Sequence, residues 1–210
     1  MLSDNFNRAY KDRDVPWSFR EPPAELVELI SSGKVKPCKT LEVGCGEGWY
    51  SIFLANAGFD ITGIDFSEEA IDAAKINAEK ASANCNFLVM NWKELPEMNH
   101  KFDFILDWRF LHEILNEEER KEYVKIIASL LKSDGKYLSV SFSEKSSLWG
   151  TGKVRHIRIP KGTMLYFASM EELEDLFGKY FKILGVKEIE LLSKGAGYCT
   201  SNYFFVERKN

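Results

Sequence analysis

The stretch that decides the fold is LEVGCGEG, residues 41–48, in which a short apolar run leads into three closely spaced glycines. The apolar run predicts a buried strand, and the apolar residues that follow the glycines, among them Tyr50, Ile52 and Leu54, predict a helix. A glycine-rich turn between a strand and a helix lets the backbone approach a bound nucleoside closely. The stretch therefore indicates an α/β domain with a ligand at this turn.

The rest of the chain repeats this alternation of short apolar runs and longer segments of helical period. Such a pattern is typical of a parallel sheet with crossover helices. The last two apolar runs predict an antiparallel hairpin. We expect one Rossmann-like, doubly wound domain with a mostly parallel sheet of seven strands, at residues 39–43, 60–64, 86–90, 102–106, 136–142, 181–190 and 198–207.

Three polar residues are expected to begin helices. Ser67 can cap the helix after the second strand, and Asn116-x-x-Glu119 and Ser169-x-x-Glu172 both match the capping box. Residues 1–36 are expected to form an irregular arm and a helix that starts at Pro22 and Pro23 and ends at Gly33. This segment should cover the binding site or the sheet edge, and residues 37–210 should form the body of the domain.

The composition excludes several classes of protein. A net charge of -4 and a pI near 5.6 give no general attraction for nucleic acid. No secretion signal and no run of about 20 apolar residues is found, so we expect a cytoplasmic protein without a membrane partner. The four cysteines are scattered, which predicts no metal site. The one basic cluster is interpreted as the solvated face of a strand, with an anion site as the alternative, and it contains Lys153, Arg155, His156, Arg158 and Lys161.

The glycine spacing separates two classes of nucleoside ligand. Asp65 lies 21 positions after Gly44, where an acidic side chain can bind ribose hydroxyls in either class. A dinucleotide site calls for G-x-G-x-x-G, but this chain has G-x-G-x-G and Trp49 at the next position. Glu42, two residues before the turn, also suits an ammonium group better than a diphosphate. A dehydrogenase is therefore the second choice.

At these residues the chain resembles the class I S-adenosylmethionine-dependent methyltransferases. The resemblance rests on LEVGCGEG, GIDFS, NWKELP and FDFILDWRFLHEI, which occur in the family's order. The arm and residues 49–74 are similar to the thiopurine and tellurite-resistance type of small-molecule methyltransferases, in which a tryptophan-containing segment folds over the cofactor. The resemblance implies S-adenosyl-L-methionine as cofactor.

The resemblance also implies roles for individual residues. Asp65 would bind the ribose, and Phe66, Asn91 and Trp92 would surround the adenine. Asp107, Trp108 and Arg109 would lie near the sulfonium and the acceptor. The predicted cofactor-binding residues are Trp17, Glu42, Gly44, Cys45, Gly46, Gly48, Asp65, Phe66, Asn91, Trp92, Asp107 and Trp108.

The acceptor is expected to be a small molecule with a thiol, amine, hydroxyl or metalloid group. Methyl transfer from a sulfonium needs mainly orientation and exclusion of water, so a dedicated base is optional. An alcohol would need one, for which His112 and Asp107 are candidates, and Arg109 would be either an ion-pair partner or an acceptor contact. The alternatives are a non-catalytic S-adenosylmethionine-binding protein and a methyltransferase acting on protein or RNA. The oligomeric state is left open.

The tryptophans suggest the walls of the site. Trp49, Trp92 and Trp108 each follow a predicted strand, Trp149 follows the fifth strand, and Trp17 lies in the arm. Open parallel sheets bind ligands at the carboxyl ends of their strands. We therefore predict a tryptophan-lined pocket at that edge.

Overall fold

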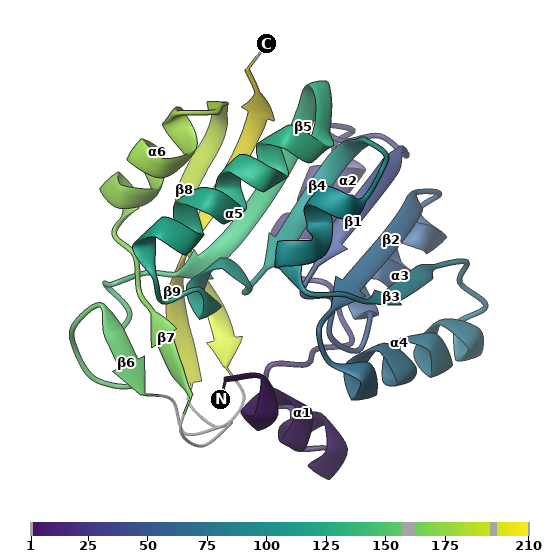
Figure 1. The fold of residues 1–210 in the computed structure, drawn as a ribbon, viewed down its shortest axis with the longest axis horizontal. Helices are drawn as coiled ribbons and strands as arrows, with labels where there is room; N and C mark the ends of the chain where they lie inside the picture. The colour runs from purple at the N-terminus through teal and green to yellow at the C-terminus, as the bar shows by residue number, and fades with distance from the viewer. Residues whose placement is uncertain (1, 157–162, 194–196, 210) are drawn as a thin grey trace.

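The chain is described by a computed structural model over residues 2–156, 163–193 and 197–209. Its main sheet has seven strands in the order β3-β2-β1-β4-β5-β9-β8 (Figure 1). Strands β1 to β5 pair in parallel, and β9 pairs antiparallel with β5 and β8. The predicted doubly wound sheet with a terminal hairpin is confirmed. The strands are β1 Lys39–Val43, β2 Asp60–Asp65, β3 Asn86–Val89, β4 Phe102–Trp108, β5 Leu131–Phe142, β8 Phe181–Ser193 and β9 Gly197–Arg208.

Helices cover both faces of the sheet. The helices are α2 Ala24–Ser31, α3 Trp49–Asn56, α4 Glu68–Lys80, α5 Glu117–Leu130 and α6 Met170–Gly178, with short 3-10 turns η1 Trp92–Glu97 and η2 Leu111–Glu113. Consecutive residues of a strand point to opposite faces. Accordingly Ile105 packs in the cluster that contains Tyr123 of α5 and Phe177 of α6. Leu106, one residue later, packs with Leu26 of α2 in the cluster on the other face.

The N-terminal segment differs from the expectation of an irregular arm. Leu2–Asp12 forms helix α1, which packs near α4 beside the open end of the sheet (Figure 1). The helix is amphipathic and buries Phe6 and Ala9. The polar residues between these positions concealed the helical period in the sequence. Helix α2 begins after Pro23 as predicted, but it packs on a face of the sheet.

The predicted caps are largely confirmed. The Ser67 hydroxyl accepts a bond from the first turn of α4, and Ser169 with Glu172 forms a complete capping box on α6. Asn116 caps α5, but the reciprocal bond of a capping box is missing. The carboxylate of Glu119 instead pairs with Lys93 of η1, at 2.6 Å.

One member of the basic cluster, Arg155, does not lie on a solvated face. Val154–His156 forms strand β6, paired with β7 Met164–Tyr166 in a separate small sheet. Arg155 is 4% exposed and donates to the backbone carbonyls of Glu144, Ser146, Leu148 and Gly152. Lys153 pairs with Glu172. Arg158 and Lys161 lie outside the described residues. The arginine therefore holds the loop after β5 together and is not available to a nucleic acid.

Candidate active site

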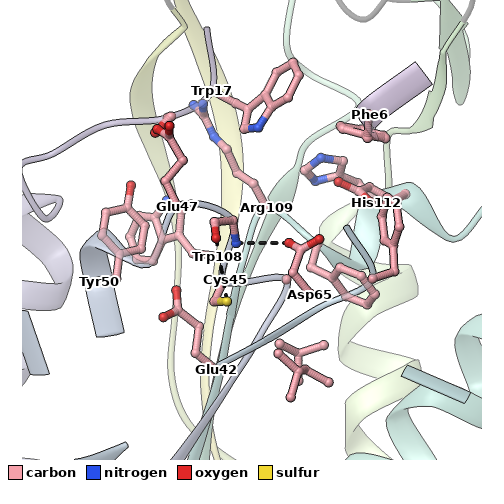
Figure 2. Close-up of a pocket in the computed structure, with 18 of the residues that line it drawn as sticks. Phe6, Trp17, Glu42, Cys45, Glu47, Tyr50, Asp65, Trp108, Arg109 and His112 are labelled. Atoms are coloured by element: carbon pink, nitrogen blue, oxygen red, sulfur yellow. Dashed lines mark hydrogen bonds between the residues drawn. The ribbon is translucent and has the colours of Figure 1, made fainter. Parts of the chain in front are cut away.

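A deep cavity opens at the carboxyl ends of strands β1 to β5, between α1 and the loop that follows β5. It is lined by the residues that follow these strands and by residues of the N-terminal segment. Figure 2 shows side chains of both groups around the same space. The lining residues are Phe6, Tyr10, Pro16, Trp17, Ser18, Phe19, Glu42, Val43, Gly44, Cys45, Gly46, Glu47, Trp49, Tyr50, Ile64, Asp65, Phe66, Met90, Asn91, Trp92, Trp108, Arg109, Phe110, His112, Glu113, Phe142, Trp149 and Leu165.

The glycine turn requires glycine at three positions. Gly44, Gly46 and Gly48 have φ values of 71°, 52° and 76°, a conformation that L-residues adopt only at a cost. A Cβ on Gly44 would lie 2.8 Å from the Phe110 ring, and one on Gly46 would lie 2.8 Å from the Tyr10 hydroxyl. Gly44 and Gly46 thus line the cavity as bare backbone.

Gly48 does not line the cavity, so its position does not fit the prediction that it contacts the cofactor. A Cβ at this position would lie 2.7 Å from Phe87 and 2.9 Å from Ala74. The residue also forms the N-cap of α3. Its role is to let α3 start close to α4 and β3.

Two carboxylates flank the turn on the cavity floor. Asp65 accepts from the backbone N–H group of Gly46 at 3.0 Å (Figure 2) and from that of Ser67 at 2.9 Å. Glu42 accepts from the Ser51 hydroxyl and is 2% exposed. Burial raises the pKa of Asp65 to about 6 and that of Glu42 to about 8. Each carboxylate retains lone pairs for a ligand, since it has about four acceptor positions.

All five tryptophans of the chain line this cavity, as the positions after the strands predicted. Trp17 donates through Nε1 to the Tyr10 hydroxyl at 3.1 Å and meets the Phe6 ring edge to face. Trp108 makes a similar contact with Tyr50, with ring centroids 6.0 Å apart. Aromatic rings therefore line the cavity, and contacts with other aromatic rings fix their orientation.

The residues predicted to surround the adenine line the cavity after the neighbouring strands β2 and β3. Phe66, Asn91 and Trp92 all line it, the first after β2 and the other two after β3. The Asn91 side chain caps η1 by accepting from the N–H of Lys93 at 3.0 Å, which fixes its orientation. Trp92 is 9% exposed and meets Tyr123 edge to face.

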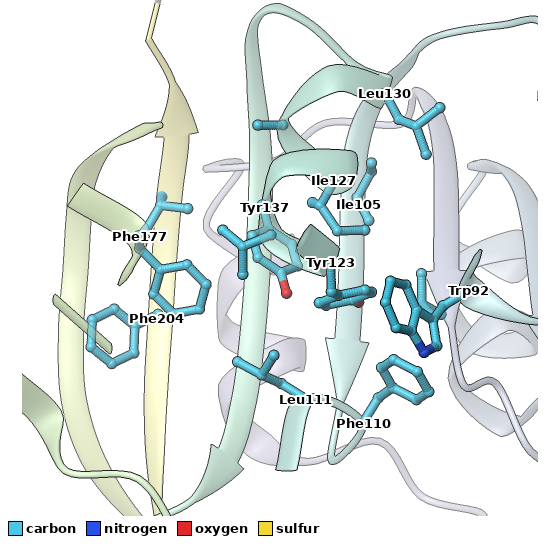
Figure 3. Close-up of a cluster of buried hydrophobic side chains, with 14 of the residues drawn as sticks. Trp92, Ile105, Phe110, Leu111, Tyr123, Ile127, Leu130, Tyr137, Phe177 and Phe204 are labelled. Carbon is cyan, nitrogen blue, oxygen red and sulfur yellow. The ribbon is translucent and has the colours of Figure 1, made fainter. Parts of the chain in front are cut away.

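Asp107 is placed differently from the prediction. It is fully buried, does not line the cavity, and accepts from the hydroxyls of Tyr123, Tyr137 and Ser139. Figure 3 shows the two tyrosines within the core cluster on the α5 face. Asp107 is in register with Val43, so its side chain points to that face. This placement does not fit the predictions that Asp107 binds the cofactor or acts as a base.

Arg109 and His112 do reach the cavity. Arg109 has a left-handed φ of 67° and donates through Nη2 to the carbonyl of Leu192 and to Cys199 Sγ, both at 3.2 Å. His112 is 4% exposed and stacks on Phe142, with ring centroids 4.2 Å apart. Burial, followed by the nearby Arg109 charge, holds the pKa of His112 well below its usual value. The side chain is thus a neutral imidazole near pH 7.

The sequence does not predict several of the lining residues. Tyr10 lies in helix α1, which the sequence pattern does not indicate, and for Tyr50 the pattern indicates a helix but no place in the site. Phe142 is the last residue of β5, and its pattern indicates a strand but no place in the site. Glu113 follows His112, and burial raises its pKa well above the usual value. Of these residues, Phe142 could have been predicted from the sequence. It stands at the carboxyl end of a strand, and the carboxyl ends of parallel strands lie at the same edge of the sheet.

Comparison with known proteins places the chain in a family. Residues 40–135 match the family described as "Methyltransferase domain". A Mycobacteroides abscessus 2-heptyl-1-hydroxyquinolin-4(1H)-one methyltransferase is 26% identical over 205 residues, which cover 94% of this chain and 85% of that protein. A ubiquinone biosynthesis O-methyltransferase of Coxiella burnetii is 30% identical over 148 residues, 69% of this chain but only 62% of that protein. An uncharacterized methyltransferase of Schizosaccharomyces pombe is 30% identical over 118 residues, which cover 56% of this chain and 80% of that protein.

Solved structures share the fold over most or all of the chain. The Burkholderia thailandensis 1,6-didemethyltoxoflavin-N1-methyltransferase, solved with S-adenosylhomocysteine, has a TM-score of 0.79 at 18% identity and covers 100% of this chain and 88% of its own. TehB from Haemophilus influenzae has a TM-score of 0.70 at 19% identity, covering 90% of this chain and 63% of its own. In the part of the chain that the structure describes, no helix is long and apolar enough to cross a membrane. With its glycine turn, its sheet order and these relatives, the chain belongs to the class I S-adenosylmethionine-dependent methyltransferases.

Proposed function

We propose that this enzyme methylates a small molecule that enters the cavity beside S-adenosylmethionine. The observation that carries the proposal is the aromatic cavity itself, which is enclosed by α1, Trp17 and the loop after β5. Enclosure of this kind excludes water and suits a compact acceptor. Relatives named for hydroxyquinolinone and ubiquinone-pathway substrates support a small acceptor.

The cofactor fits the floor of the cavity in one direction. Glu42 would face the ammonium group, and the bare backbone of Gly44, Cys45 and Gly46 would lie along the methionine part. Asp65 would accept from the ribose hydroxyls. At the far end, Phe66, Asn91 and Trp92 would contact the adenine, and Trp17 and Trp108 would close over the sulfonium, whose positive charge favours aromatic faces. S-adenosylmethionine supplies an activated methyl group, and the protein supplies orientation and a dry site.

The proposal is tested with binding and turnover measured separately. Calorimetry and tryptophan fluorescence with S-adenosylmethionine should both report binding, because five tryptophans line the cavity. Release of S-adenosylhomocysteine is then screened with small thiols, amines, phenols and metalloid anions. Binding without release in the presence of any of these acceptors would contradict the proposal.

A further inference from the structure

The cavity has a second side that the cofactor contacts do not use. We call it the acceptor side, defined by Arg109, His112, Phe142, Trp149 and Leu165, which come from the ends of β4 and β5, from η2, from β7 and from the loop after β5. The inference below depends on the proposed function, since it takes the cofactor to occupy the floor around Glu42 and Asp65.

The polar atoms of the acceptor side have incomplete hydrogen bonding. Arg109 Nε and His112 Nδ1 are both buried without a partner. No described residue bonds to His112 Nε2 or Arg109 Nη1, and neither atom is enclosed in the way Nδ1 and Nε are. Buried polar groups are rarely left unpaired in native proteins. Nε2 and Nη1 are therefore the atoms through which these two side chains can bind a ligand.

The charges on this side are also unbalanced. Arg109 forms no ion pair with a carboxylate of the described residues. Glu47, which also lines the cavity, already accepts from Ser18 and Trp49. His112 beside the guanidinium is neutral. One uncompensated cation and one neutral base thus face the same space.

The walls around these two groups are flat. Phe142 stacks on Phe167 with centroids 5.1 Å apart at 11°, and Trp149 meets Phe142 edge to face at 5.5 Å. The Arg109 guanidinium lies 5.2 Å from the centroid of Phe142. Because His112 and Phe167 both stack on Phe142, this ring can meet an acceptor only through its edge, a contact that planar aromatic rings make favourably.

We infer that the acceptor is a planar aromatic molecule with an acidic ring hydroxyl, whose oxygen is bound by Arg109 and whose proton is accepted by His112. The oxygen lone pair then forms the O–CH3 bond while the C–S bond breaks, and its electron pair returns to sulfur. The proton resides on His112 Nε2, and the neighbouring Arg109 charge favours its release to solvent. The guanidinium stabilises the negative charge that develops on the oxygen before transfer.

Three matched probes test this inference: 2-naphthol, 2-naphthalenethiol and 2-naphthylamine. His112→Gln should lower kcat/KM for 2-naphthol by about 100-fold or more, because a general base contributes about 10²- to 10⁴-fold. The same variant should leave the thiol nearly unaffected, because a thiolate forms near neutral pH without a base. Arg109→Gln should lower 2-naphthol turnover by about 100-fold, as removal of an oxyanion donor does. Both variants should bind S-adenosylmethionine like the wild type.

The control variants are His100→Gln and Arg8→Gln, at exposed positions away from the cavity. Two results would overturn the inference while leaving the proposed function intact. One is a wild-type enzyme that methylates the thiol or the amine but not 2-naphthol. The other is an Arg109→Gln variant that loses cofactor affinity with an unchanged KM for the acceptor, which would assign Arg109 to the cofactor carboxylate. If the wild type binds no S-adenosylmethionine, the proposed function itself fails.

Discussion

The cofactor side and the acceptor side of the cavity differ in hydrogen bonding and in backbone strain. On the cofactor side, left-handed φ values fall on Gly44 and Gly46, and the carboxylate of Asp65 already accepts two bonds. On the acceptor side, left-handed φ values fall on Arg109 and Trp149. Such backbone strain persists only where the surroundings enforce it, and it clusters at functional sites. On the cofactor side the polar groups have hydrogen-bond partners within the protein and the left-handed residues are glycines. On the acceptor side Arg109 and His112 have buried polar atoms without partners, and the left-handed residues carry side chains.

The difference suggests that the two sides are held in place in different ways. The cofactor side consists of a turn and two strand ends, whose shape is determined by local backbone structure. The acceptor side depends on the network below it, in which Asp107 joins β4 to Tyr137 and Ser139 of β5 and to Tyr123 of α5. The comparison predicts different consequences for substitutions on the two sides.

The largest effect is expected for Asp107→Ala, which removes the support of the acceptor side. The buried hydroxyls of Tyr123 and Tyr137 would lose their acceptor, at about 1 to 3 kcal/mol for each unsatisfied group. We expect the free energy of unfolding to fall by about 3 kcal/mol in urea titrations. Asp103→Ala is the control, because Asp103 forms an exposed ion pair with Lys132 and should cost less than about 1 kcal/mol. An Asp107→Ala protein of wild-type stability would show that the network does not support the fold.

The next effect is on cofactor affinity. Asp65→Ala should weaken binding by about 1.5 to 3 kcal/mol, the contribution of hydrogen bonds to a charged group, or roughly 10- to 150-fold in Kd. Turnover at saturating cofactor should change less. Asp60→Ala, at the exposed start of the same strand, is the matched control for calorimetry. Unchanged affinity in Asp65→Ala would remove this carboxylate from the cofactor site.

A smaller effect concerns pH. Burial raises the pKa of Glu42 to about 8, so most molecules are protonated there at pH 7 without ligand. Pairing with an ammonium group favours the ionised form, so cofactor binding should release a proton and affinity should rise with pH between 6 and 7.5. Release of one proton can change the affinity for the cofactor by at most about tenfold per pH unit. Calorimetry in buffers of different ionisation enthalpy measures the released proton.

Asp65, with a pKa of about 6, adds to the pH dependence of cofactor affinity at the acidic end of this range. Glu42→Gln should remove the part near neutral pH, and a variant with the wild-type profile would show that Glu42 does not face the ammonium group.

The two sides also differ in how far the sequence predicted them. Periodicity and glycine spacing predicted the sheet and the positions of Gly44, Asp65 and Trp92, because local chain geometry determines these features. The side chain of Asp107 is in register with Val43 and points to the α5 face, and this register is a tertiary property. Helix α1 was missed because its polar surface concealed a short apolar stripe. The partners of Arg109 lie on β8 and β9, more than 80 positions away in the chain.

The smallest expected effect concerns the strain at Arg109. A left-handed conformation costs an L-residue about 1 to 2 kcal/mol, whereas glycine avoids this but loses more entropy on folding, about 0.5 to 1 kcal/mol. Arg13→Gly is the matched control, because Arg13 has a φ of 56°, is exposed and lies outside the cavity. It should stabilise the fold by up to about 1 kcal/mol with unchanged turnover. Arg109→Gly gains the same relief but loses its bonds to Leu192 and Cys199, so its unfolding free energy should stay within about 1 kcal/mol of the wild type while methyl transfer to 2-naphthol is lost. A strong destabilisation by Arg109→Gly would show that this arginine serves the fold, and that the acceptor side is as complete in itself as the cofactor side.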